Sequence, residues 1–141
     1  MKKDVLIKIK DAQTVGGEVE RVEIITRGSY EGSPEDYTLE FTELFDDEFE
    51  CRTKLFVKER SRVTMIRSGS YNSELIIEDK KRHSCHYATP YGEFMIGIYA
   101  KNVDSDVTQD GGTLKMNYTI DYYAGLAAEN HMVISVDTFK S

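Results

Sequence analysis

The stretch that decides the fold is LKMNYTIDY, residues 114–122, in which apolar and polar residues alternate without a break. On a helix, these apolar residues would scatter around the whole cylinder. On a pleated strand they all point to one face, and the polar residues point to the other. The stretch therefore predicts a β-strand with one buried and one solvated face, as antiparallel sheets require.

The same alternation recurs in five further segments, which predicts more strands of the same kind. Between these segments lie less regular stretches rich in β-branched and aromatic residues, at 55–58, 62–67, 75–78 and 85–88. Together they predict about eight to ten strands. The five alternating segments are centred on Ile7, Ile24, Leu39, Ile96 and Ile134.

Short connections with turn residues separate the predicted strands. Strands joined in this way pair with their neighbours, and a meander of this length tends to curl and close. We therefore predict an all-β antiparallel meander closing into a barrel, with a two-layer sandwich as the alternative that periodicity leaves open. Residues 104–112 are expected to form the one longer loop, and residues 125–130 the one helical turn. The turn signals are Gly16-Gly17, Gly32-Ser33-Pro34, Ser68-Gly69-Ser70, Pro90-Tyr91-Gly92 and Gly111-Gly112.

Length and composition predict one cytoplasmic domain spanning residues 1–141. The net charge is -7 and no basic run is present, so nucleic acid and anionic membranes are not expected partners. No signal-peptide core or apolar membrane segment is evident, because Lys8 interrupts the first apolar run. Two cysteines are too few for a disulfide scaffold of this size.

Three segments carry a resemblance to a known family. They are HYATPYGEF at residues 86–94, the run from residue 53 to residue 69, and the stretch that begins at Gly112-Thr113-Leu114. Nearly the whole chain resembles the YwiB-like family of uncharacterised bacterial proteins. The resemblance implies a calycin, or lipocalin-like, β-barrel and implies no particular activity.

Soft metal ligands gather only at His83, Cys85 and His86, and a strand would turn His86 away from the other two. A tetrahedral zinc site needs four converging ligands, so we predict no metal site. The aspartates of residues 104–110 suggest a calcium loop, but the position that needs an acidic ligand is Lys115. This segment is interpreted as a solvated acidic loop, and no cofactor is expected.

Carboxylates are dense between residues 43 and 50, where Glu43, Asp46, Asp47, Glu48 and Glu50 lie. Paired carboxylates serve acid–base catalysis only when their geometry is fixed. Nothing in the sequence fixes it here, so we interpret the group as a charged edge or loop that discourages strand pairing. No nucleophile motif accompanies it, and an enzyme is the least favoured class.

The barrel interior is the remaining place for a function. The leading prediction is a binding module for a small, largely apolar ligand, and the rival is a solid barrel that serves as an interaction or structural protein. Tyrosine hydroxyls on the inner face would orient a ligand or bond to one another. Arg67 would meet a ligand head group or, as the favoured reading, close one end of the barrel through internal hydrogen bonds. The oligomeric state is not predicted. The ligand-binding candidates are Arg67, Phe94, Ile96, Met116, Tyr118 and Tyr122.

Overall fold

The computed structural model describes residues 2–44, 50–69, 72–89, 92–122 and 125–139. These residues form ten antiparallel strands, each paired with the next along the chain, and β1 pairs with β10 to close a barrel. Closure confirms the barrel and excludes the sandwich. The strands are β1 (Lys3–Val15), β2 (Glu18–Gly32), β3 (Asp36–Leu44), β4 (Glu50–Lys58), β5 (Arg62–Gly69), β6 (Asn72–Glu78), β7 (Arg82–Thr89), β8 (Gly92–Ser105), β9 (Gly112–Tyr122) and β10 (Gly125–Thr138).

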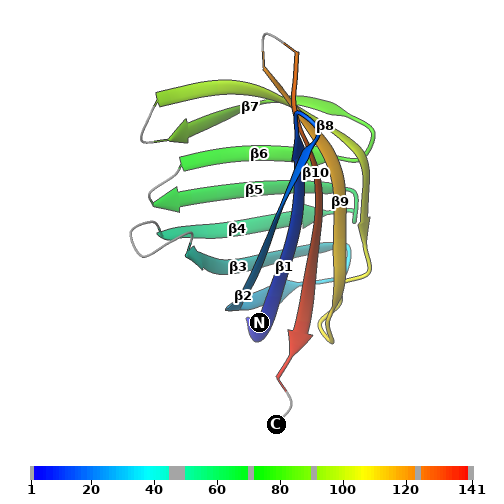
Figure 1. Ribbon diagram of the computed structural model, residues 1–141. Helices are drawn as coiled ribbons and strands as arrows, with labels where there is room; N and C mark the ends of the chain where they lie inside the picture. Colours follow the sequence, from blue (N-terminus) through cyan, green and yellow to red (C-terminus); the bar gives the residue numbers. More distant parts are fainter. Residues whose placement is uncertain (1, 45–49, 70–71, 90–91, 123–124, 140–141) are drawn as a thin grey trace.

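The barrel has two sides whose strands run in different directions (Figure 1). Strands β3 to β7 run across the molecule, whereas β1, β9 and β10 run steeply past them, and the long strand β8 curves from one side to the other. A register shift between Ala100 and Asn102 interrupts the pairing of β8 with β9. Such bulges bend a strand and increase its twist, which suits a strand that turns a corner.

Strand β2 begins to pair with β3 at Gly28. An added Cβ at this position would lie 2.5 Å from Ile7 Cδ1 and from the Glu40 carbonyl oxygen, so only glycine allows this close approach. Beyond it, β2 pairs with β3 over only five residues, Gly28 to Gly32. Residues 18–27 of β2 pair with β1 alone in the part of the chain that the structure describes.

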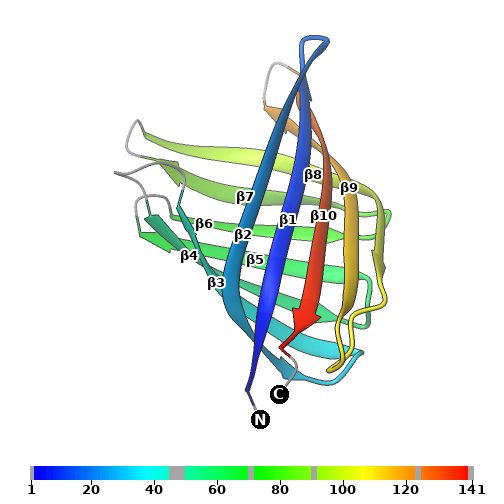
Figure 2. The ribbon, with the colours of Figure 1, turned by 60° about the horizontal axis from the view of Figure 1, so that its bottom comes forward.

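The connections divide the barrel into two ends. The turn at Gly16-Gly17 and the connections at residues 45–49, 70–71, 90–91 and 123–124 belong to one end, because every odd-numbered strand runs toward it. The four other connections belong to the opposite end. Both termini lie near that second end, at the bottom of Figure 2.

The second end, which we call the Tyr37 end, is tightly filled. The Tyr37 hydroxyl hydrogen bonds to Ser105 Oγ at 2.6 Å, and the Tyr37 ring stacks on Tyr30 at 5.4 Å. Val107, in the long connection between β8 and β9, is fully buried. Burial raises the pKa of Tyr37 to about 12, although the hydrogen bond between Tyr37 and Ser105 opposes that shift. Side chains therefore fill this end of the interior.

Two sequence expectations about local structure have different outcomes. The longer loop is confirmed, since residues 106–111 connect β8 to β9. The helical turn at residues 125–130 is wrong, because these residues begin β10 and pair with β9. A register shift between Leu126 and Ala128 explains why the pattern there does not alternate. Within the described residues, no helix is both long and apolar enough to cross a membrane.

Candidate functional site

The inward-facing side chains change from apolar to polar along six of the ten strands. On β3, the series Leu39, Phe41 is followed two residues later by Glu43, and on β5 Met65 is followed by Arg67. Since successive inward positions on a strand are two residues apart, these charged residues continue the core face of the barrel. Four more strands switch in the same way, and the resulting polar layer consists of Asp11, Glu43, Thr53, Arg67, Ser73 and Asn130.

The strand register brings one half of the polar layer together. Thr53 on β4 lies directly opposite Arg67 on β5, which in turn lies opposite Ser73 on β6. Opposed residues in an antiparallel pair have their Cβ atoms about 4.5–5.5 Å apart, close enough for direct contact. These three side chains therefore form a continuous row on one wall of the interior.

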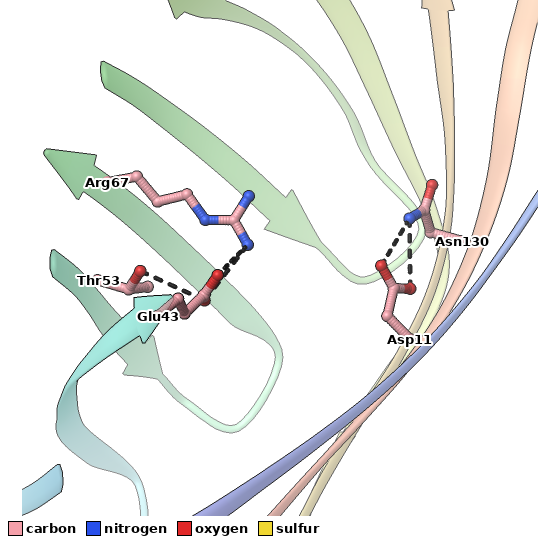
Figure 3. Close-up of polar contacts among 5 residues, drawn as sticks. All are labelled: Asp11, Glu43, Thr53, Arg67 and Asn130. Atoms are coloured by element: carbon pink, nitrogen blue, oxygen red, sulfur yellow. Dashed lines mark hydrogen bonds and ion pairs between the residues drawn. The ribbon is translucent and has the colours of Figure 1, made fainter. Parts of the chain in front are cut away.

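Glu43 and Arg67 form an ion pair within this wall (Figure 3). Arg67 Nη2 lies 3.4 Å from each carboxylate oxygen of Glu43, and Thr53 Oγ1 donates a hydrogen bond to Glu43 Oε1 at 3.3 Å. The Glu43 side chain is only 3% exposed and the Arg67 side chain 18%. A charge this deeply buried needs a partner, and here the chain supplies its own.

Asp11 and Asn130 lie on the opposite wall (Figure 3). Asn130 Nδ2 donates to both carboxylate oxygens of Asp11 at 3.3 Å, and Asn130 Oδ1 accepts a hydrogen bond from Gln13 at 3.3 Å. Burial raises the pKa of Asp11; the hydrogen bond from Asn130 and the positive charge of Arg67 lower it, and the negative charge of Glu43 raises it further. The two walls therefore interact electrostatically across the interior.

The charge of the polar layer and the state of its Ser73 hydroxyl indicate which ligand groups it could bind. Its ionisable side chains are two carboxylates, Asp11 and Glu43, and one guanidinium, so it favours neutral or cationic groups over anions. The Ser73 hydroxyl is buried and, among the described residues, has no hydrogen-bond partner. Ser73 lies opposite Arg67, which cannot act as a base, so the pair has the chemistry of recognition and not of an activated nucleophile.

The predicted ligand-binding residues fall into three groups. Arg67 belongs to the polar layer, as its position before the turn suggested. Ile96, Met116 and Tyr118 are buried inside the barrel at 5%, 0% and 4% exposure. The side chains of Phe94 and Tyr122 lie outside the described part of the structure, although their backbones belong to β8 and β9.

One interpretation of the acidic segment needs correction. Glu43 is not part of a charged edge, because it is buried inside the barrel and paired with Arg67. Glu50 begins β4 and is exposed, whereas Asp46, Asp47 and Glu48 lie outside the described residues. The missed signal is the period itself, since Glu43 continues the inward series of Leu39 and Phe41. The same reading of each strand would have found Asp11, Thr53, Ser73 and Asn130.

The other candidate clusters lie apart from the polar layer. His83 Nε2 pairs with Glu78 at 2.8 Å, Cys85 is buried and His86 is exposed. In the described ranges, no three metal-ligating side chains lie together. In the acidic loop, Asp106 Oδ1 accepts a hydrogen bond from the Thr113 amide at 2.6 Å, which gives this aspartate a structural role.

A surface groove of about 570 Å³ passes beside the backbone of β1 on the outside of the barrel. Its lining includes Asp11 and Val22, which share the parity of the inward residues, but most of the lining has the opposite strand parity: Lys10, Ala12, Arg21, Glu23, His131 and Val133. It is therefore a feature of the outer face, and the convergence of buried polar groups favours the interior as the candidate site.

Comparisons with known proteins agree with this fold. A family model described as a domain of unknown function (DUF1934) matches residues 7–134. No curated protein matches the chain. Among solved structures, the chain is similar to the ywiB protein from Bacillus subtilis, with 19% sequence identity, a TM-score of 0.86, and coverage of 99% of this chain and 94% of that one. These matches confirm the resemblance read from the sequence, and at this identity the structural match shows a shared fold.

Proposed function

Because the chain belongs to the DUF1934 family, a domain family of unknown function, we propose a function from the barrel interior: a binding module for a small, largely apolar molecule that carries one polar head group. The observation that carries this proposal is the switch from apolar to polar residues at one layer of the interior. The apolar body would lie among Ile96, Met116 and Tyr118. Phe94 and Tyr122 are predicted from the sequence to line the same region. The head group would meet the polar layer.

The size of the barrel supports this reading. An eight-stranded barrel has an interior that side chains just fill, or that holds one small ligand as in lipocalins. The diameter grows with strand number, and this barrel has ten strands. The likeness to calycin barrels is an analogy of fold, so the ligand class is argued from the side chains alone.

The charges of the polar layer select the head group. Arg67 is already paired with Glu43, and Asp11 adds a second carboxylate. An anionic head would therefore be repelled, whereas a hydroxyl or an ammonium group would find acceptors on Asp11 and Glu43. The buried Ser73 hydroxyl gains a hydrogen bond if a ligand group reaches it, which removes the cost of an unpaired polar atom.

The proposal includes a cytoplasmic location. Cys85 is a free and buried thiol, and Cys51 is buried as well, which suits a reducing compartment. The rival function is a solid barrel that acts through its surface. The tightly filled Tyr37 end favours that rival for half of the interior, so the test must address the polar end.

The test is calorimetric titration with three probes of equal chain length: decanol, decylamine and decanoate. We expect one-to-one binding of decanol or decylamine and at least about tenfold weaker binding of decanoate, because one like-charge contact costs on the order of 1 kcal/mol or more. Ser73→Val should lower the affinity for the probe that binds. Ser84→Val, on the exposed outer face of β7, is the matched control. Equal binding of all three probes, or equal effects of both variants, would overturn the proposed head-group site.

A further inference from the structure

The first hairpin presents an unpaired strand edge. Strand β2 pairs with β3 only over Gly28–Gly32, so in the described residues the edge of its segment 18–27 that faces away from β1 has no partner strand. All six residues from Glu18 to Glu23 are exposed, on both faces of the strand. An unpaired edge offers free backbone N–H and C=O groups, which are a template for another strand.

Large apolar side chains are concentrated on the same hairpin. Val15, Val19, Val22 and Ile25 are 52%, 48%, 48% and 59% exposed. Isolated exposed apolar residues are normal on a protein surface, but a cluster along one unpaired edge is typical of an interaction site. Charged residues protect many edges from such pairing, so the pattern of charges decides which partner fits.

The side-chain order along β2 is self-complementary. Its outward positions carry Val19, Arg21, Glu23 and Ile25, which read apolar, cation, anion, apolar. When two copies of this segment pair antiparallel with Val22 opposite Val22, Arg21 faces Glu23 of the second copy and Val19 faces its Ile25. The two-fold symmetry repeats each contact, as an isologous interface requires.

We propose that the unpaired edge of β2 is a homodimer interface, in which two copies of this chain join edge to edge about a two-fold axis at Val22. Opposite charges and apolar pairs directly across an antiparallel ladder stabilise it, whereas like charges destabilise it. Within the described residues, neither Arg21 nor Glu23 takes part in an ion pair of its own chain. Their charges are thus available to the second copy.

The register also gives the interface its size. The contact extends from Val19 to Ile25, because Thr26 Oγ1 hydrogen bonds to the Thr42 carbonyl at 3.1 Å and β3 adjoins β2 from there on. A ladder of this length is small, so the dimer is expected to form reversibly in the micromolar range and not to be obligate.

Analytical ultracentrifugation over the micromolar range, with charge-reversal variants, tests this interface. The unchanged chain should show a concentration-dependent monomer–dimer equilibrium. Arg21→Glu and Glu23→Arg should each weaken dimerisation about tenfold or more, because each places two pairs of like charges across the ladder. Lys115→Glu, an equal charge change on the outer face of β9, is the control and should leave the equilibrium unchanged.

Charge exchange separates an interface from a folding defect. The double variant R21E/E23R restores opposite charges across the two-fold axis and should dimerise again. A mixture of the two single variants should form a heterodimer, since one copy then carries two anions and the other two cations at these positions. A monomer at every concentration, or a dimer indifferent to these reversals, would overturn the proposal.

Cross-linking tests the register. Residues at the axis lie about 4.5–5.5 Å apart between Cα atoms, which is within reach of a disulfide. Val22→Cys should therefore form a covalent dimer under mild oxidation. Glu20→Cys, which faces Ile24 of the second copy, should not, and preferential cross-linking through Glu20→Cys would contradict the axis at Val22.

Discussion

The two ends of the barrel interior follow the same alternation and yet hold different chemistry. At the Tyr37 end, inward positions carry apolar and aromatic side chains; Tyr37 and Ser105 hydrogen bond to each other, whereas the buried Tyr30 hydroxyl has no hydrogen-bond partner among the described residues. At the other end, inward positions carry the polar layer, including a buried ion pair and a hydroxyl without a partner among the described residues. Ring stacking and apolar packing explain the burial of Tyr30 at the first end, whereas the second end buries two carboxylates and a guanidinium that packing does not require.

This difference distinguishes the end of the interior that stabilises the fold from the end that we propose binds a ligand. Burying an ion pair rarely stabilises a fold more than well-packed apolar residues of the same size would. A barrel selected for stability alone would continue the apolar series of β3 and β5 past Phe41 and Met65. The polar layer is therefore the part of the interior that a ligand would explain.

The largest expected effect belongs to the Tyr37 end. Leu114→Ala should lower the free energy of unfolding by about 3 kcal/mol, because Leu114 is fully buried and the surrounding barrel can collapse only in part. Chemical denaturation measures this loss. A cost below about 1 kcal/mol would show that this end is loosely filled and would weaken the contrast between the two ends.

The buried ion pair should show a cost that depends on which partner is removed. Arg67→Leu leaves the Glu43 carboxylate buried without its cation and should cost about 2–3 kcal/mol. The double variant E43L/R67L removes both charges and should recover most of that loss. Arg82→Leu is the control, because its pair with Asp121 is more exposed, at 54% and 28%, and should contribute little. If the double variant were as unstable as the single one, the pair would be a structural requirement of the barrel.

The hydrogen bond between Tyr37 and Ser105 at the Tyr37 end should make the stability of the protein depend on pH in the alkaline range. Tyr37→Phe should cost about 1 kcal/mol at neutral pH, from the lost hydrogen bond to Ser105. Because burial raises the pKa of Tyr37 from 10.0 to about 12, the unchanged protein should lose additional stability as the pH rises through this interval. The difference between the two proteins should therefore shrink there. A constant difference would contradict the raised pKa.

Substitution of Asp11 should have the smallest effect on the free energy of unfolding, and unlike the three substitutions above it should stabilise the protein at neutral pH. Burial raises its pKa above the ordinary value of 3.8, so the folded protein binds the proton more tightly than the unfolded chain does. The free energy of unfolding therefore falls as the pH rises from 3.8 through the raised pKa of Asp11, and Asp11→Asn should remove this fall. We expect Asp11→Asn to be stabilising at neutral pH relative to its effect below 3.8, with the exposed Asp137→Asn as control. Parallel pH profiles of these two variants would contradict the assignment.

The sequence predicts the barrel well because the signal for it is local. Alternation in residues 114–122 and its recurrence fixed the strand type, and the Gly16-Gly17 turn fixed the first hairpin. The period of each strand is enough to identify the members of the polar layer, but which of them meet depends on which strands face each other across the interior, and this follows only from closure. Arg67 stands out in the sequence as a cation directly before the Ser68-Gly69 turn, whereas Glu43 is one of several carboxylates in its segment and does not stand out. Residues 125–130 misled because a bulge breaks the alternation there.

The most direct measurement of the central claim is native mass spectrometry of the protein purified from a bacterial host, followed by solvent extraction of any bound molecule. We expect a reproducible one-to-one companion with an apolar body and a neutral or cationic head, reduced in Ser73→Val and retained in Ser84→Val. A clean mass of the protein alone, unchanged after incubation with decanol and decylamine, would contradict the binding function and leave the polar layer without a ligand.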